Sequence, residues 1–117
     1  MRVGQPLRRL PRVAGPPLCV RDDFAYEAGR FQLEPGDTLC MMTDGVIEAT
    51  NAGGALYGRA RLETVLRDLA EASSATATMT HALAADVSRF AAGAGPADDI
   101  AILVLRWKGP AAAARAT

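Results

Sequence analysis

The sequence predicts an α+β fold in which a mainly antiparallel sheet carries two helices packed on one face. Three observations lead to this prediction: short apolar runs within residues 17–42, two helical periodicities within residues 58–93, and a strongly apolar run at residues 100–107. Strands followed by helices and a closing strand are typical of α+β domains. The chain has 117 residues and is 50% apolar, which predicts a single domain with its own core.

The N-terminal part of the chain predicts irregular structure followed by strands. Residues 1–17 contain four prolines, and we expect an irregular segment over residues 1–14. Residues 17–20 are a short strand candidate. Residues 24–33 alternate until the pattern slips at Gly29, which predicts a bulge or a hairpin turn. Pro35 and Gly36 fit the centre of a type II turn. The continuous apolar run at residues 38–42 then predicts a strand buried on both faces.

The middle of the chain predicts two amphipathic helices, each with one apolar stripe. The first stripe consists of Leu62, Val65, Leu66 and Leu69, and the second of Met79, Leu83, Val87 and Phe90. Ser74 or Thr76 is expected to cap the second helix, and Gly93 to stop it. Residues 100–107 predict the closing strand of a domain that spans residues 15–107. Residues 108–117 lack a packing pattern and are expected to fray.

Composition excludes several classes of partner. Thirteen basic and thirteen acidic residues give a formal charge of zero, which argues against a nucleic-acid or membrane-surface partner. No apolar run resembles a signal peptide or approaches the roughly 20 residues of a membrane span. We therefore expect a cytoplasmic protein. Cys19 and Cys40 lie in apolar contexts and are expected to be buried small hydrophobic residues rather than a disulfide.

Two places in the chain carry groups that suggest chemistry. Thr43, Asp44 and Gly45 follow a predicted buried strand, and Asp98 and Asp99 precede another. If the two strands are neighbours, their polar ends meet at one edge of the sheet, where converging carboxylates would favour a hard cation such as Mg²⁺ or Mn²⁺. The alternatives remain open on the residues alone, because Asp-Gly is an ordinary turn dipeptide and aspartate also caps helices.

The order of motifs resembles a known family. The stretches "GPPLCV", "FQLEPGDTLCMMTDGVIEATNAGG", "LYGRARL" and "GPADDIAILVLR" follow one another over residues 15–106. In this order they resemble the C-terminal half of a PPM-type (type-2C) serine/threonine phosphatase. The chain is most similar to the SpoIIE-like bacterial branch, which includes phosphatases acting on anti-sigma-factor antagonists. The resemblance implies a partial PPM-type sandwich and a phosphoprotein substrate.

The resemblance also implies roles for individual residues. Asp44 and Asp98 match carboxylate ligands of a centre of two Mn²⁺ or Mg²⁺ ions, which activates a water for attack on phosphoserine or phosphothreonine. Gly45 is expected to permit a tight turn, while Asp99 and Thr43 would lie beside the ligands. No catalytic residue beyond the metal ligands is implied.

Other positions that match the family have no predicted part in catalysis. Residues 48–58, "EATNAGGALYG", resemble a flap that is expected to set substrate access. Cys19 stands where the family prefers glycine, which matters because cysteine disfavours positive φ. Core packing is expected for Met41, Met42 and Met79, with Met42 at the family's usual tyrosine position. Solvent-exposed positions on helices are expected for His81, Arg59 and Arg61.

One family motif has no counterpart in this sequence. The family's N-terminal half supplies a metal-bridging aspartate in an Asp-x-x-Gly-His-Gly segment, whereas the one histidine of this chain, His81, has no such context. We therefore expect weak metal binding and little phosphatase activity from the isolated chain. The alternative is a non-catalytic phosphatase remnant, which would bind a partner or a second copy through the surface that the absent half would cover.

Overall fold

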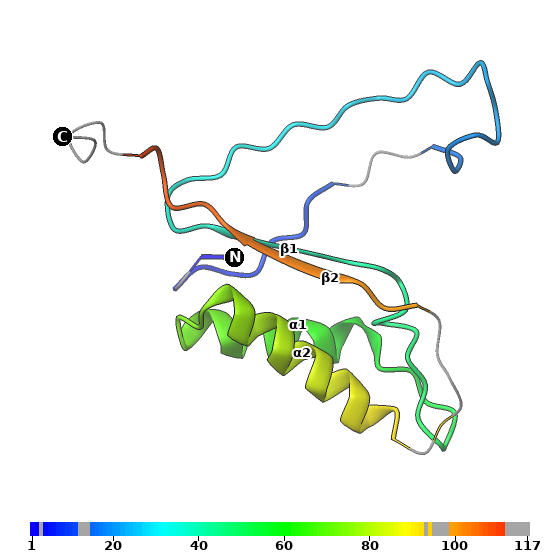
Figure 1. The fold of residues 1–117 in the computed structure, drawn as a ribbon, viewed down its shortest axis with the longest axis vertical. Helices are drawn as coiled ribbons and strands as arrows, with labels where there is room; N and C mark the ends of the chain where they lie inside the picture. The colour runs from blue at the N-terminus through cyan, green and yellow to red at the C-terminus, as the bar shows by residue number, and fades with distance from the viewer. Residues whose placement is uncertain (3, 12–14, 93, 95–98, 112–117) are drawn as a thin grey trace.

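The computed structural model describes residues 1–2, 4–11, 15–92, 94 and 99–111. The chain forms β1 (Thr38–Met42), α1 (Gly58–Glu71), α2 (Thr76–Phe90) and β2 (Ile102–Arg106) in that order. Figure 1 shows both helices on the same side of the two strands. The predicted α+β class with helices on one face of an antiparallel sheet is confirmed.

The two strands pair antiparallel, with Thr38 opposite Arg106 and Met42 opposite Ile102. The end of β1 therefore lies beside the start of β2. Because side chains alternate between the faces of a sheet, one set turns to the helices and the other turns away. Met42 and Ile102 pack against the core, while Met41 and Leu103 remain 45% and 55% exposed. The prediction that β1 is buried on both faces is wrong, because no described element covers its second face.

Residues of both predicted apolar stripes lie in the core. α2 packs against both β2 and α1. The central cluster of buried residues consists of Val46, Ala49, Tyr57, Leu62, Leu66, Leu83 and Val87. Full burial of a leucine or valine side chain contributes about 1.5–3 kcal/mol. Met79 is 1% exposed and is a core residue as predicted, whereas the prediction of core packing for Met41 is wrong.

The corner between the helices differs from its prediction. Ala75 precedes α2 without any side-chain cap, so the capping role predicted for Ser74 or Thr76 is wrong. The two serines instead finish α1. Ser74 N donates to Leu69 O at 3.2 Å, and Ser73 has a φ of 52°, which is the Schellman geometry usually given to glycine. The predicted stop at Gly93 lies outside the described residues, and α2 ends at Phe90.

The segment of residues 15–33, which we call the arm, contains no strand. Residues 17–20 form a turn in which Val20 N donates to Pro17 O, so the predicted strand there is wrong. Residues 24–33 are extended but unpaired, and the second predicted strand is also wrong. Figure 1 shows the arm standing away from the sheet. The radius of gyration, 17.3 Å, accordingly exceeds the roughly 13 Å of a compact chain of this length.

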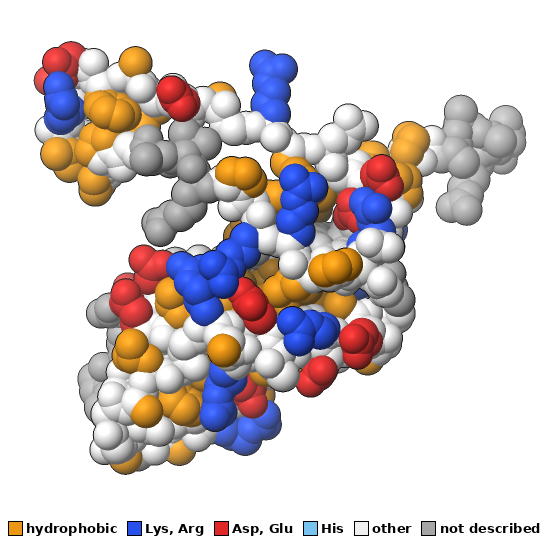
Figure 2. All heavy atoms as spheres, turned by 180° about the vertical axis from the view of Figure 1, so that it is seen from behind, with side chains coloured by type: hydrophobic (Ala, Val, Ile, Leu, Met, Phe, Trp, Pro, Cys, Tyr) orange, Lys and Arg blue, Asp and Glu red, His pale blue; other side chains and the backbone are white. Residues whose placement is uncertain are grey.

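The far end of the arm is apolar and exposed. Figure 2 shows hydrophobic side chains gathered there, and Leu18 and Val20 are 78% and 65% exposed. Cys19 is also exposed, which contradicts its predicted burial. Its φ of 69° lies in the left-handed region that favours glycine, so this chain accepts the strain of a cysteine there.

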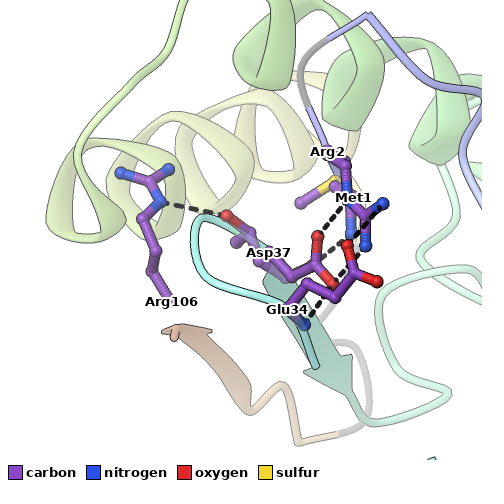
Figure 3. Close-up of polar contacts among 6 residues, drawn as sticks. Met1, Arg2, Glu34, Asp37 and Arg106 are labelled. Atoms are coloured by element: carbon purple, nitrogen blue, oxygen red, sulfur yellow. Dashed lines mark hydrogen bonds and ion pairs between the residues drawn. The ribbon is translucent and has the colours of Figure 1, made fainter. Parts of the chain in front are cut away.

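The turn before β1 forms as predicted and is anchored by a buried carboxylate. Asp37 N donates to Glu34 O at 2.9 Å, and Gly36 has the positive φ of 94° that a type II turn requires. Asp37 is 5% exposed and accepts from Arg2 Nε and Nη2 at 2.5 and 2.8 Å. Figure 3 shows Arg2 beside Glu34 and Asp37. The Arg2 guanidinium holds the pKa of the Asp37 carboxyl well below its usual range.

The surface positions predicted on the helices are also exposed. His81 and Arg59 are solvent-exposed, as expected. No helix in the described ranges is both long enough and apolar enough to cross a membrane.

Candidate metal centre

The end of β1 and the start of β2 are tied together by Thr43. Its backbone N donates to Ala101 O at 3.0 Å. Its hydroxyl donates to Asp99 O at 3.1 Å and accepts from Ala101 N at 3.0 Å. A threonine hydroxyl has one donor and two acceptor sites, so this side chain can serve both segments at once. Thr43 and Asp99 therefore meet at one edge of the sheet, as the strand order predicted.

Asp44 begins a turn that holds its side chain in solvent. We call residues 43–47 the Asp44 turn. Val46 N donates to Thr43 O at 3.2 Å, and Glu48 N donates to Asp44 O at 2.9 Å. Val46 is fully buried, whereas Asp44 is exposed. Burial of Val46 thus anchors the turn in the core, and the Asp44 carboxylate is left accessible at the sheet edge.

The helix-cap alternative for Asp44 does not hold. α1 begins only at Gly58 and has Tyr57 at its N-cap position. No described residue donates a hydrogen bond to the Asp44 carboxylate, so its oxygens are free of partners within the described part of the chain. Gly45 is buried and takes part in the predicted turn, but it does so without a positive φ. Its φ therefore does not by itself demand glycine.

The flap, residues 48–58, is a short hairpin built on the Asp44 turn. Thr50 and Leu56 form an antiparallel bridge. At its tip the Asn51 side-chain oxygen accepts from Gly53 N at 3.0 Å and from Ala55 N at 2.9 Å. An asparagine side chain that bonds the following backbone is a common way to stabilise a tight turn. The flap is consequently an ordered element and not a loose loop.

The base of the flap is closed by Tyr57 and Gly58. Tyr57 N donates to Ala49 O at 2.7 Å, and Gly58 N donates to Ile47 O at 2.9 Å. These two bonds join the returning strand of the flap to the residues that follow Asp44. The positive φ of Gly58, 77°, lets the chain turn from the flap directly into α1.

Tyr57 is also fixed by its side chain. The ring is 3% exposed, and its hydroxyl donates to Asp86 Oδ2 at 2.6 Å. Burial, and after it the hydrogen bond to Asp86, raises the pKa of the Tyr57 phenol. The same hydrogen bond, together with Arg89, lowers the pKa of Asp86. The tyrosine therefore stays neutral and the aspartate stays charged over the ordinary pH range.

Two further side chains enclose the Tyr57 ring. Phe90 stands edge-on to it at 5.5 Å between centroids. The Arg61 guanidinium lies 4.6 Å from the Phe90 centroid and 5.6 Å from that of Tyr57. Arg61 is exposed as predicted, but it also covers two aromatic rings, which sequence analysis missed.

Comparison with known proteins decides the family. Residues 4–108 match the family described as Stage II sporulation protein E (SpoIIE). The chain belongs to the SpoIIE family. This family is of the PPM phosphatase type, and membership implies dependence on Mn²⁺ or Mg²⁺ in general. No curated protein and no solved structure matches the chain.

The SpoIIE-family metal centre can be tested against the residues present. The accessible Asp44 carboxylate offers the oxygen donors that hard cations prefer. Asp98, the second predicted ligand, lies outside the described residues. Within the described ranges, no group of three or more His, Cys, Asp or Glu side chains could hold a metal ion. Among the described residues, the sheet edge therefore presents one accessible carboxylate and not a complete set of metal ligands.

Proposed function

We propose that this chain forms one side of a Mn²⁺- or Mg²⁺-dependent phosphoprotein phosphatase site that acts on phosphoserine or phosphothreonine. The observation that carries this proposal is the accessible Asp44 carboxylate at the end of β1, beside the start of β2. Thr43 joins the two segments through its hydroxyl. The SpoIIE family match supports the same reaction class.

Each residue at this edge has a distinct role in the proposed site. Asp44 and Asp98 would hold the metal ions. Thr43 keeps the Asp44 turn in register with Asp99, and Val46 anchors that turn in the core. Bound ions would supply an activated water for attack on phosphorus and neutralise charge on the phosphoryl oxygens. The chain's own contribution is to orient the carboxylates and to border the substrate with the flap.

The family resemblance supports a proposal for the substrate class. We propose a phosphoprotein of bacterial signalling, of the anti-sigma-factor antagonist type, encountered in the cytoplasm. The balanced formal charge of the chain is consistent with a protein partner rather than nucleic acid. Little activity is expected from the isolated chain, because two carboxylates do not complete a two-metal site.

The direct test is complementation. The chain is mixed with the complementary N-terminal portion of a SpoIIE-family phosphatase, and phosphate release from a phosphoserine protein is followed with Mn²⁺. We expect release from the mixture but not from either part alone. Asp44→Asn should abolish it, while the matched control Glu71→Gln, an exposed carboxylate at the end of α1, should leave it intact. Robust hydrolysis of p-nitrophenyl phosphate by the chain alone, equal in Asp44→Asn, would contradict the proposal.

A second candidate function is a non-catalytic interaction module. The observation in its favour is the uncovered sheet face, where Met41, Leu103, Leu105 and Trp107 are 45%, 55%, 43% and 40% exposed. The register places Met41 opposite Leu103, so these side chains form one apolar surface. Contiguous apolar surface of this kind favours association with another protein or with a second copy.

Light scattering across a concentration series tests this second candidate. If the sheet face mediates self-association, the mass should rise toward a dimer with concentration, and Leu103→Glu should keep the chain monomeric. Arg59→Glu, an exposed change on α1, is the matched control. A monomer at every concentration would remove the self-association proposal.

A further inference from the structure

We propose that Asp86 is a positioning residue for the Asp44 turn, acting through Tyr57 and the base of the flap. The proposal rests on the proposed function only in taking Asp44 as a metal ligand. The physical linkage between α2 and the Asp44 turn is independent of any metal.

The first step of the linkage joins α2 to the flap. Asp86 accepts the Tyr57 hydroxyl at 2.6 Å, and Arg89 Nη2 donates to the other carboxylate oxygen at 3.1 Å. The Asp86 side chain is 24% exposed, so this charge-assisted bond is largely shielded from water. A hydrogen bond to an ionised acceptor is roughly twice as strong as a neutral one. The tyrosine hydroxyl is therefore held at a fixed point on α2.

The second step runs along the backbone of Tyr57. The same residue that bonds Asp86 through its side chain donates its N–H to Ala49 O at 2.7 Å, and the next residue, Gly58, donates to Ile47 O at 2.9 Å. Any shift of the Tyr57 ring along α2 must move these two amides. It must also move the carbonyls to which they are bonded.

The third step reaches Asp44 itself. Ile47 belongs to the Asp44 turn, and Glu48 N donates to Asp44 O at 2.9 Å. On its other side the turn is held by Thr43 against Asp99. The backbone of Asp44 is thus held from two directions, by the sheet edge and by the flap base. Only the flap base depends on the fixed position of Tyr57.

Packing and positioning can be separated by mutation. Phe90 and Arg61 hold the Tyr57 ring by contact, so Tyr57→Phe keeps the buried ring and removes the hydroxyl alone. The Asp86 carboxylate then still has Arg89 as its partner and partial access to water. Asp86→Asn retains an oxygen acceptor for the Tyr57 hydroxyl, whereas Asp86→Ala removes it.

Tyr26 supplies a matched control for the tyrosine change. Its hydroxyl donates to Pro16 O at 2.9 Å, within the arm and away from the Asp44 turn in the fold (Figure 1). Tyr26→Phe therefore deletes the same atom from a hydrogen bond that lies outside the flap. It leaves the flap untouched.

The test combines amide hydrogen exchange without metal and Mn²⁺ titration followed by NMR line broadening. In Tyr57→Phe and Asp86→Ala, we expect faster exchange at the amides of Glu48, Tyr57 and Gly58. Mn²⁺ affinity should fall roughly three- to tenfold, less than the roughly 10–100-fold typical of groups bonded directly to a ligand. In Asp86→Asn, amide exchange and Mn²⁺ affinity should stay close to their wild-type values, and Tyr26→Phe should change neither quantity.

The possible results separate the two proposals. Unchanged exchange and unchanged Mn²⁺ affinity in Tyr57→Phe would overturn the positioning role of Asp86, while the proposed metal site would survive. Faster exchange in Tyr57→Phe, in a chain whose wild type binds no Mn²⁺ at Asp44, would leave the positioning of the turn standing and overturn the metal site. A matched fall in thermal stability for Tyr57→Phe and Asp86→Asn alike, without the exchange pattern, would show a packing role only.

Discussion

Ser73 offers a test of how the two helices are joined. Its φ of 52° places a side chain in the left-handed region, which costs about 1–2 kcal/mol relative to ordinary conformations. Ser73→Gly removes that strain but loses more backbone entropy on folding, by about 0.5–1 kcal/mol. The net expectation is a stabilisation of about 0.5–1 kcal/mol. An unfolding entropy of about 2.1 cal/mol/K per residue over 117 residues converts this into a rise of roughly 2–4 °C.

Thermal unfolding followed by circular dichroism measures this change. Ser73→Val should lower the midpoint, because a β-branched residue suits a positive φ least. Ser74→Gly is the matched control, since the φ of Ser74 is not positive and glycine should only destabilise there. If Ser73→Gly were neutral or destabilising while Ser73→Val was tolerated, the Schellman ending of α1 would be refuted.

Three further predictions address the core, the pH dependence and the thiols. Leu83→Ala, at a fully buried position, should lower the free energy of unfolding by about 2–5 kcal/mol in urea titration, and a loss under 1 kcal/mol would contradict the observed packing. The lowered pKa values of Asp37 and Asp86 stabilise the folded chain fully above about pH 4, and this stabilisation is lost as pH falls further. In Asp37→Asn, the urea midpoint of unfolding should therefore fall less steeply with pH below about pH 4 than in the wild type. Exposed Cys19 should react rapidly with an aromatic disulfide reagent, whereas Cys40, whose pKa is raised by burial, should react slowly; equal rates would argue against this difference in burial.

Apolar periodicity predicted the elements that pack against one another. Residues of both helical stripes and one side of the run at residues 38–42 contribute to the core, whereas Met41 on the other side of that run is exposed. The strand prediction for residues 24–33 was wrong because alternating apolar residues indicate which side chains share a face but do not supply a neighbouring strand. In the described part of the chain, no strand lies beside these residues. The predicted cap of α2 was wrong because serine is as typical of turns as of helix starts, and Ser73 and Ser74 form the turn that ends α1.

The candidate site could be predicted in part from the order of the strands. The strand order implied that Thr43 and Asp99 would meet at one edge, and their hydrogen bond follows from the antiparallel register. The hydrogen bond from Tyr57 to Asp86 could not be predicted, because it joins the residue before α1 to α2 and depends on how the two helices pack. Neither residue has a local motif that marks it as a partner of the other.

An NMR titration with Mn²⁺ shows directly whether the Asp44 edge is one side of a metal site. Paramagnetic broadening should first affect the amides of residues 43–45 and 99–101, binding should be weak, and Asp44→Asn should abolish the effect while Glu71→Gln preserves it. Broadening centred elsewhere, or broadening at residues 43–45 that persists in Asp44→Asn, would show that Asp44 is not a metal ligand.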